Sequence, residues 1–247
     1  METRSASVHL GTSGWTYDHW LDRFYPPEIP KKKWFEFYCS HFPTVELNAS
    51  FYRIPKPAVV EGWEKRSPPG FVFSIKVSRL ITHIKRLKNC RKEIDWFFTT
   101  FSGLRKKIGV YLFQLPPTLK FDGELLRDFI PQLPRDTPLV FEFRDSQWLN
   151  DETCAILDEH RAGFCIADRG DPATEKRVIG ALAYIRFHGY RVDYGGSYPD
   201  AVLRQWASWI SAQQKKGITV FAYFNNDRDG FAVQNCLKLR EIVGDWV

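Results

Sequence analysis

The sequence predicts an α/β protein of the (β/α)8 TIM-barrel class, folded as a single domain over residues 1–247. Three observations lead to this fold class. Eight short segments recur along the chain, and each begins as an apolar run and turns polar toward its C-terminal end. Stretches with apolar residues at helical spacing separate these segments. The length of 247 residues is also close to the ~250 residues typical of this barrel.

The eight segments are predicted strands because each begins as an apolar run of strand length. They are VHLGTSGW from Val8, TVELNASFY from Thr44, FVFSIKVS from Phe71, GVYLFQLP from Gly109, PLVFEFRD from Pro138, GFCIADR from Gly163, LAYIRFHG from Leu182 and ITVFAYFNND from Ile218. A strand buried on both faces stays apolar unless its end opens onto a site. The shared polar end therefore marks the C-terminal rim, where such barrels carry their chemistry.

Helices are predicted between and after the strands from the spacing of apolar residues. The predicted ranges are 33–42, 58–66, 94–107, 123–132, 151–161, 199–216 and 231–243. We expect Asp151 to be the N-cap of its helix and Asp200 to supply the acid of a first turn. The link 170–181 between the sixth and seventh strands is short enough to hold no more than one helical turn.

Composition places the chain among ordinary globular proteins with a basic excess. Lys and Arg total 35 against 29 Asp and Glu, a formal net charge of +6. This excess favours anionic partners, although a solvated basic surface also explains it. The five cysteines form no CxxC pair, so neither a zinc site nor a disulfide framework is indicated. The sequence has no apolar core of signal-peptide length and no membrane span, so we expect a cytoplasmic protein without membrane association.

Polar residues near the strand ends are predicted to face the barrel interior. Residues two apart in a strand point the same way. The pairs are Glu46 and Asn48, Ser74 and Lys76, Glu142 and Arg144, Arg186 and His188, and Tyr223 and Asn225, while Gln114 and Asp168 end their own strands. Neighbours such as Val45, Phe143 and Ile185 are apolar, as positions that face helices require. The polar members are therefore expected to point inward.

Two interpretations of these inward charges stay open. Unpaired buried charges cost several kcal/mol each, and the carboxylates and cations here are nearly balanced in number. The carboxylates are Glu46, Glu142 and Asp168, and the cations are Lys76, Arg144 and Arg186. One interpretation is a structural salt-bridge network. The other, which we favour because so many polar residues converge at one rim, is a site for an anionic ligand.

Candidate roles follow from the chemistry of these side chains. Candidate acid–base groups are Glu142, Glu46, Asp168 and His188. Glu142 beside Arg144 is expected to stay ionised, which suits a base, and His188 is either a titrating group near neutrality or a hydrogen-bonded structural residue. Candidate substrate-binding residues are Trp15, Asn48, Tyr52, Lys76, His83, Gln114, Arg144, Arg186, Tyr223 and Asn225.

No motif for an organic cofactor is present, and no GxSxG, HExxH or Walker loop occurs. The carboxylates with His188 resemble the ligand set of divalent-metal barrels. The cations among the carboxylates would neutralise them, so a divalent metal is the less favoured alternative and no metal ligands are assigned.

Two long loops, 16–30 and 79–92, follow the first and third strands, where a barrel places functional loops. Aromatic residues crowd the same rim. They are Trp15, Tyr17, Trp20, Phe24, Tyr25, Phe51, Tyr52, Trp148, Tyr190, Tyr194 and Tyr198. Packing of loops onto the barrel explains such a cluster by default. Together with the basic residues Arg53, Lys56, Arg79, Lys85, Arg86 and Lys88, exposed members would also suit nucleic-acid binding.

Motifs along nearly the whole chain carry a family resemblance. They are GTSGWTYDHW, FYP, TVELNASFYRIP, FVFSIKVSRLITH, LFQLPP, FEFRDSQW, IADR, YIRFHG and YFNND. With these motifs the sequence resembles the YecE-like family, also called domain of unknown function family 72. The resemblance implies a TIM-barrel fold and implies no particular reaction.

The sequence therefore supports three hypotheses for the function, each of a different class. The leading hypothesis is an enzyme, of hydrolase or isomerase type, that acts on a phosphorylated or other anionic small molecule. The alternative is a nucleic-acid-binding protein or nuclease that uses the basic and aromatic rim. The third is a binding or regulatory barrel without turnover, in which the inward charges hold structure. Fold class alone does not choose among them.

Overall fold

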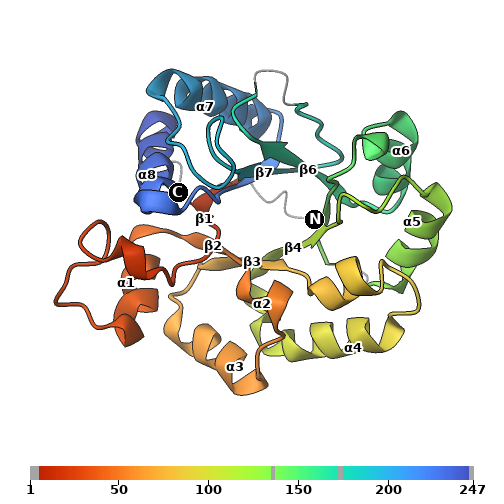
Figure 1. The fold of residues 1–247 in the computed structure, drawn as a ribbon, viewed down its shortest axis with the longest axis horizontal. Coiled ribbons are helices and arrows are strands. Elements are labelled where there is room, and N and C mark those ends of the chain that lie inside the picture. Colours follow the sequence, from red (N-terminus) through yellow and green to blue (C-terminus); the bar gives the residue numbers. More distant parts are fainter. Residues whose placement is uncertain (1–5, 135–136, 172–174, 245–247) are drawn as a thin grey trace. The chain divides into compact units, whose positions relative to one another are not determined.

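The computed structural model describes residues 6–134, 137–171 and 175–244. Eight strands alternate with helices along the chain (Figure 1). The strands are β1 (Val8–Thr12), β2 (Thr44–Leu47), β3 (Val72–Lys76), β4 (Ile108–Gln114), β5 (Leu139–Glu142), β6 (Gly163–Asp168), β7 (Leu182–Phe187) and β8 (Thr219–Phe224). Each coincides with a predicted segment, and the pairs β1–β8, β7–β8, β3–β4, β4–β5 and β5–β6 are all parallel. The predicted (β/α)8 TIM-barrel fold class is confirmed.

The α-helices are α1 (Trp34–His41), α2 (Ala49–Tyr52), α3 (Pro57–Arg66), α4 (Arg91–Thr100), α5 (Gly123–Phe129), α6 (Asp151–Glu159), α7 (Asp200–Lys215) and α8 (Phe231–Val243). All but α2 correspond to predicted ranges. The helix α2 was not predicted, because a single turn is too short to show apolar residues at helical spacing. In the described part of the chain, no helix combines the length and apolar character that crossing a membrane requires.

The predicted helix over 94–107 is wrong in its second half. The α-helix ends at Thr100, and a 3₁₀ helix spans Ser102–Lys107. Ser102 and Gly103 are weak helix formers at this boundary, which explains the change of helix type. Shorter 3₁₀ helices lie at Asp18–Trp20, Lys31–Lys33, Ile130–Gln132, Ser146–Trp148 and Arg228–Gly230, and one π-helical turn lies at Leu80–Ile84.

The N-cap predicted for α6 is also wrong by one residue. The side chain of Asn150 accepts a hydrogen bond from the backbone N of Thr153 at 2.7 Å, so Asn150 is the cap. Asp151 instead lies in the first turn. Asp200 lies in the first turn of α7, as predicted. Residues 172–174 of the link 170–181 lie outside the described residues, and the described remainder of that link contains no helix.

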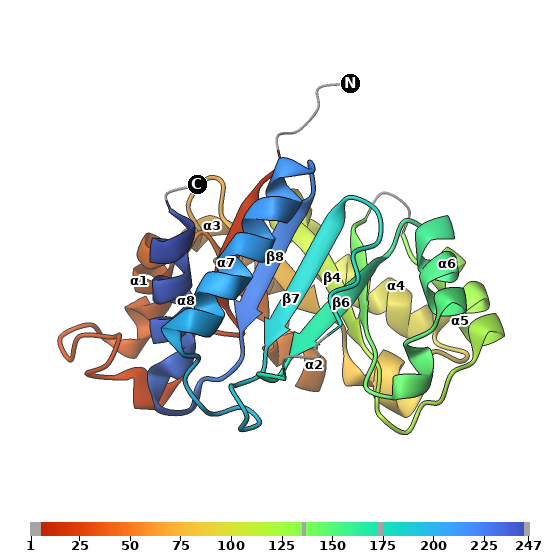
Figure 2. The ribbon, with the colours of Figure 1, turned by 90° about the horizontal axis from the view of Figure 1, so that it is seen from above.

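The chain divides into two compact units. The N/C unit comprises the chain up to Glu46 together with the chain from Ile166, and the middle unit comprises Leu47–Cys165. In the N/C unit β1 pairs with β8, which pairs with β7, and Ser13 bridges to Glu46 of β2. Figure 2 shows α7 alongside β7 and β8, and α8 packs against β1, β8 and α7.

In the middle unit β3, β4 and β5 pair in sequence order, and β5 continues to the first residues of β6. The helices α5 and α6 lie side by side in this unit (Figure 1). Core residues such as Phe73, Leu112 and Phe141 have no exposed surface. The strands are buried along almost their whole length, and for this reason their sequences read as apolar runs until the polar end.

Candidate functional site

In the N/C unit, Glu46 on β2 and Arg186 on β7 form a buried ion pair. Arg186 donates from Nη2 to Oε1 of Glu46 at 2.8 Å and from Nε to Oε2 at 2.9 Å. Ser13 Oγ donates to Oε1 at 2.6 Å, and the Tyr184 hydroxyl donates to Oε2 at 2.8 Å. The Arg186 and Glu46 side chains are 1% and 0% exposed. The carboxylate thus receives four hydrogen bonds, two of them in a bidentate pair.

This geometry supports the structural interpretation for the Glu46–Arg186 pair. Four donors fill the roughly four lone-pair positions of a carboxylate. Tyr223 also has a buried hydrogen-bond partner, because its hydroxyl oxygen lies 2.7 Å from Oγ1 of Thr44. The predicted roles of Glu46 in catalysis and of Arg186 and Tyr223 in substrate binding stay predictions. The partners Ser13 and Tyr184 were not predicted.

Three predicted residues meet beyond the carboxyl ends of β6, β7 and β8. The backbone N of His188 donates to the carbonyl of Asp168 at 2.7 Å. The side-chain Nδ2 of Asn225 lies 3.2 Å from Nδ1 of His188, so Asn225 donates and that imidazole nitrogen accepts. Oδ2 of Asp168 accepts from the backbone N of Gly170 at 3.2 Å. His188 and Asp168 are 0% and 2% exposed.

The loop between β7 and α7 is held by residues that were not among the predicted catalytic or binding residues. Gly189 has φ +112°, and a Cβ there would lie 1.9 Å from the carbonyl oxygen of Gly195, so the position requires glycine. The Tyr198 hydroxyl donates to the carbonyl of Asp168 at 3.2 Å. Burial, followed by the charge of Asp168, raises the pKa of Tyr198. Oδ1 of Asn235 on α8 accepts from the backbone N of Tyr198 at 3.0 Å and fixes the end of the loop.

Most of the rim aromatics serve packing, which was the default interpretation. Trp20, Tyr25 and Trp148 have no exposed surface. Trp15 is partly buried, its ring centroid lies 4.8 Å from that of Phe35, and its carbonyl accepts from the Tyr25 hydroxyl. Its assignment to substrate binding is untested.

In the middle unit, Lys76 and His83 share one aromatic ring. Lys76 ends β3 and is 8% exposed, and its Nζ lies 4.0 Å from the centroid of the Phe51 ring. His83, on the π-helical turn, meets the same ring edge-on with centroids 4.9 Å apart. A cation over an aromatic face is stabilised electrostatically. Phe51 on α2 therefore contacts both predicted binding residues, although the sequence analysis named Phe51 only among the rim aromatics and not as a site residue.

Four cations surround His83. Burial and the positive charges of Lys76, Arg79, Arg144 and Arg86 lower the pKa of His83 from 6.5 to about 4. Nδ1 of His83 lies 2.8 Å from the Thr82 hydroxyl oxygen. The imidazole is therefore neutral at physiological pH, because burial and then the positive charges nearby disfavour its protonated form.

Glu142 supplies a carboxylate to the same unit. It ends β5, is 0% exposed, and its Oε1 lies 2.6 Å from Nε of Arg144, whose side chain is 10% exposed. Gln114, the last residue of β4, stands opposite Glu142 in the strand register. The predicted pairing of Glu142 with Arg144 is present in the structure.

Asn48 and Tyr52 follow β2 in the middle unit. Oδ1 of Asn48 is a buried acceptor without a hydrogen-bond partner among the described residues, a condition that is uncommon for buried polar atoms. The Tyr52 side chain is 72% exposed. Asn48 is thus an acceptor that a bound molecule or water would satisfy, whereas Tyr52 presents its ring to solvent.

The middle unit thus holds a cluster of Lys76, His83, Glu142 and Arg144, with Arg79 and Arg86 near His83. This cluster contains more cationic than acidic side chains, and hard divalent cations require the opposite balance. Across the described residues, no group of three or more His, Cys, Asp or Glu side chains is arranged to hold a metal ion.

Comparisons with known proteins fit this fold. The family model "Protein of unknown function DUF72" matches residues 9–246. The UPF0759 protein YunF of Bacillus subtilis (strain 168) is 26% identical over 269 residues, covering 96% of this chain and 94% of YunF. The UPF0759 protein YecE of Escherichia coli (strain K12) is 30% identical over 139 residues, covering 56% of this chain and 44% of YecE.

Two solved structures of DUF72 family proteins share the fold. The protein from Thermotoga maritima has a TM-score of 0.85 and 24% identity, with 96% of this chain and 99% of that chain covered. The protein from Enterococcus faecalis has a TM-score of 0.82 and 20% identity, with 96% and 95% covered. At these identities the likeness establishes the fold and carries no chemistry.

Proposed function

We propose that this chain, which belongs to the DUF72 family, is an enzyme that acts on a phosphorylated or other anionic small molecule through the cluster in the middle unit. The family resemblance read from the motifs is confirmed. One observation carries the proposal: Lys76, Arg79, Arg144 and Arg86 lie close enough to His83 to add to the effect of burial, and together they lower its pKa to about 4. A site with that positive potential favours an anion.

Lys76 and Arg144 are the proposed anion ligands. The side chains of both are largely buried, at 8% residue exposure for Lys76 and 10% side-chain exposure for Arg144. Electrostatic interactions strengthen as the local dielectric falls, so a partly desolvated cation binds a phosphoryl or carboxylate group more tightly than a surface lysine does. The guanidinium of Arg144 also matches the bidentate geometry of such groups.

Glu142 is the proposed general base, and His83 the proposed neutral hydrogen-bonding group. The Glu142 carboxylate contacts Arg144 at 2.6 Å, so a proton acceptor lies next to the proposed anion ligand. Hydrolysis and isomerisation both require such an acceptor. A neutral imidazole contributes a hydrogen bond without repelling the cations that bind the anion.

Sulfate binding followed through the pKa of His83 tests this function. Sulfate keeps its charge across the titration range, and an anion bound between the cations favours the imidazolium. We therefore expect the NMR-measured pKa of His83 to rise from about 4 as sulfate is added. By linkage, sulfate should bind more tightly as the pH falls toward that pKa.

Two variants test whether the anion binds at the cluster in the middle unit. Lys76→Met should weaken binding of sulfate and phosphate by at least about tenfold, a loss of roughly 1.4 kcal/mol, and should raise the pKa of His83 in the free protein. Lys216→Met removes an exposed lysine at the end of α7 and should change neither quantity. The proposal would be wrong if the pKa of His83 did not change on addition of sulfate and Lys76→Met bound phosphate as tightly as the unmodified protein.

A further inference from the structure

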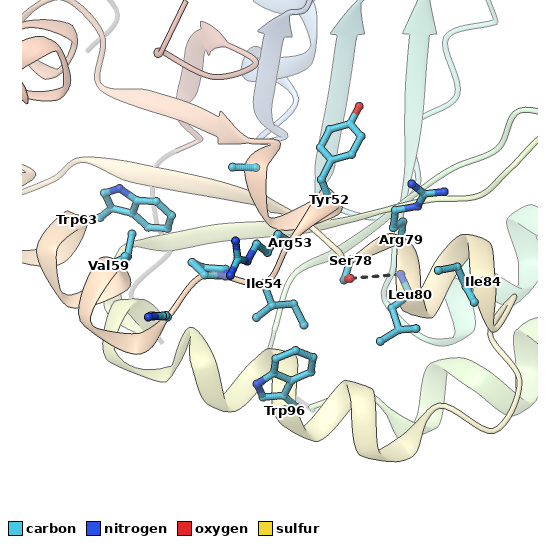
Figure 3. Close-up of a pocket in the computed structure, with 13 residues that line it drawn as sticks. Tyr52, Arg53, Ile54, Val59, Trp63, Ser78, Arg79, Leu80, Ile84 and Trp96 are labelled. Atoms are coloured by element: carbon cyan, nitrogen blue, oxygen red, sulfur yellow. Dashed lines mark hydrogen bonds between the residues drawn. The ribbon is translucent and has the colours of Figure 1, made fainter. Parts of the chain in front are cut away.

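We propose that a groove on the middle unit is a docking site for an acidic, apolar peptide segment of a partner protein. The groove has a volume of about 1200 Å³ and is lined by residues of α2, α3, α4 and the turn around Leu80 (Figure 3). This volume exceeds the roughly 300–1,000 Å³ of small-molecule pockets. The inference does not rest on the proposed enzymatic function.

The centre of the groove is apolar and open to solvent. Figure 3 shows the side chains of Ile54 and Leu80 pointing toward Trp96 on α4. Trp96, Ile84 and Val59, which all line the groove, are 54%, 60% and 44% exposed. Single exposed apolar side chains are common on protein surfaces, but several gathered in one hollow with polar neighbours mark an interaction surface.

The charged residues of the groove are all of one sign. Arg53, Lys56 and Arg79 line it, and among the described lining residues none is acidic. None of these three side chains forms an ion pair with a carboxylate in the described part of the chain. Cations that lack an internal carboxylate partner are complementary to carboxylates on an incoming segment, and such complementarity sets specificity and association rate.

The composition favours a peptide over a nucleic acid. Trp and Arg are enriched at the energetic centres of protein–protein interfaces, and the groove presents Trp96 and Arg53. Single-stranded nucleic acids bind mainly by stacking bases on aromatic faces. Here the centre offers the aliphatic side chains of Ile54 and Leu80 beside Trp96, while the Tyr52 ring points away from that centre (Figure 3).

Selection from a phage-displayed library of random dodecapeptides on the immobilised full-length protein tests the inference. We expect enrichment of peptides that combine Asp or Glu with large apolar residues. A labelled enriched peptide should then lose at least about tenfold in affinity on Trp96→Ala and again on Arg53→Glu, as hot-spot and charge-reversal substitutions do. Neither residue belongs to the anion cluster, so phosphate binding should stay intact in both variants.

Matched controls separate the groove from general surface effects. Leu237→Ala truncates a 39% exposed apolar side chain on α8, and Lys216→Glu reverses an exposed charge. Both should retain the affinity of the unmodified protein for the enriched peptide. Failure to enrich acidic, apolar peptides, equal affinity in the groove variants and the controls, or tighter binding of a single-stranded oligo(dT) probe that Trp96→Ala and Arg53→Glu weaken would each overturn the proposal.

Discussion

Glu46 and Arg186 illustrate how a buried charge is tolerated at the scale of single residues. Moving a carboxylate out of water costs several kcal/mol after relaxation. Here the cost is offset by Arg186, Ser13 and Tyr184, which together supply four hydrogen bonds to Glu46. The pair therefore depends on all of its members, and loss of one leaves a buried charge or donor without compensation.

Glu46→Gln is expected to lower the free energy of unfolding by about 3–5 kcal/mol, because the buried Arg186 would lose the charged carboxylate that accepts two of its hydrogen bonds. Urea denaturation of the variant measures this change. Glu241→Gln is the matched control, since Glu241 pairs with Lys238 on the surface with 70% of its side chain exposed and surface pairs contribute little. The structural interpretation of the buried pair is wrong if Glu46→Gln lowers the free energy of unfolding no more than Glu241→Gln does.

The sequence could identify polar strand positions and the pair of Glu142 with Arg144, but not the contacts made by the other site residues. Alternation along a strand indicates that Glu142 and Arg144 face the same way, and the structure pairs them at 2.6 Å. The contact of Lys76 and His83 with Phe51 depends on a one-turn helix after β2. Neither spacing nor composition encodes such through-space geometry, so the residue-level site was only partly predictable.

At the scale of elements, the sequence predicted which helices and strands exist better than it predicted the residues at which they end. All eight strands were found because each is a buried apolar run, which is a strong signal. Helix ends depend on one hydrogen bond or one residue with low helix propensity. The boundary at Thr100 and the cap at Asn150 are of this kind, and single-residue patterns define them weakly.

The cap of α6 gives a direct test at this scale. Asn150→Ala should lower the free energy of unfolding by about 1 kcal/mol, because the backbone N of Thr153 loses its acceptor. Asp151→Ala should cost only a few tenths of a kcal/mol from its interaction with the helix dipole. Thermal and urea unfolding of the two variants measures both losses in the free energy of unfolding. A larger loss for Asp151→Ala would reinstate Asp151 as the cap.

At the scale of the whole molecule, each compact unit contains a histidine whose pKa is lowered. His9 on β1 of the N/C unit stacks on Phe221 with ring centroids 4.5 Å apart, and burial lowers its pKa from 6.5 to about 4. His83 of the middle unit is lowered to about 4 by burial and the surrounding cations. Both imidazoles are therefore neutral in the folded protein at a pH where the unfolded chain already binds protons.

This difference makes the stability of the fold depend on pH in a defined direction. Between pH 6.5 and 4 the unfolded state binds more protons than the native state, so the free energy of unfolding falls as the pH is lowered through this window. Urea denaturation between about pH 5.5 and 7 measures this slope, and Asp145 and Glu93, whose pKa values are lowered, stay largely ionised there. His9→Gln and His83→Gln should each flatten the slope, and the double variant should flatten it most. An unchanged slope in the double variant would mean that neither imidazole is held neutral by folding.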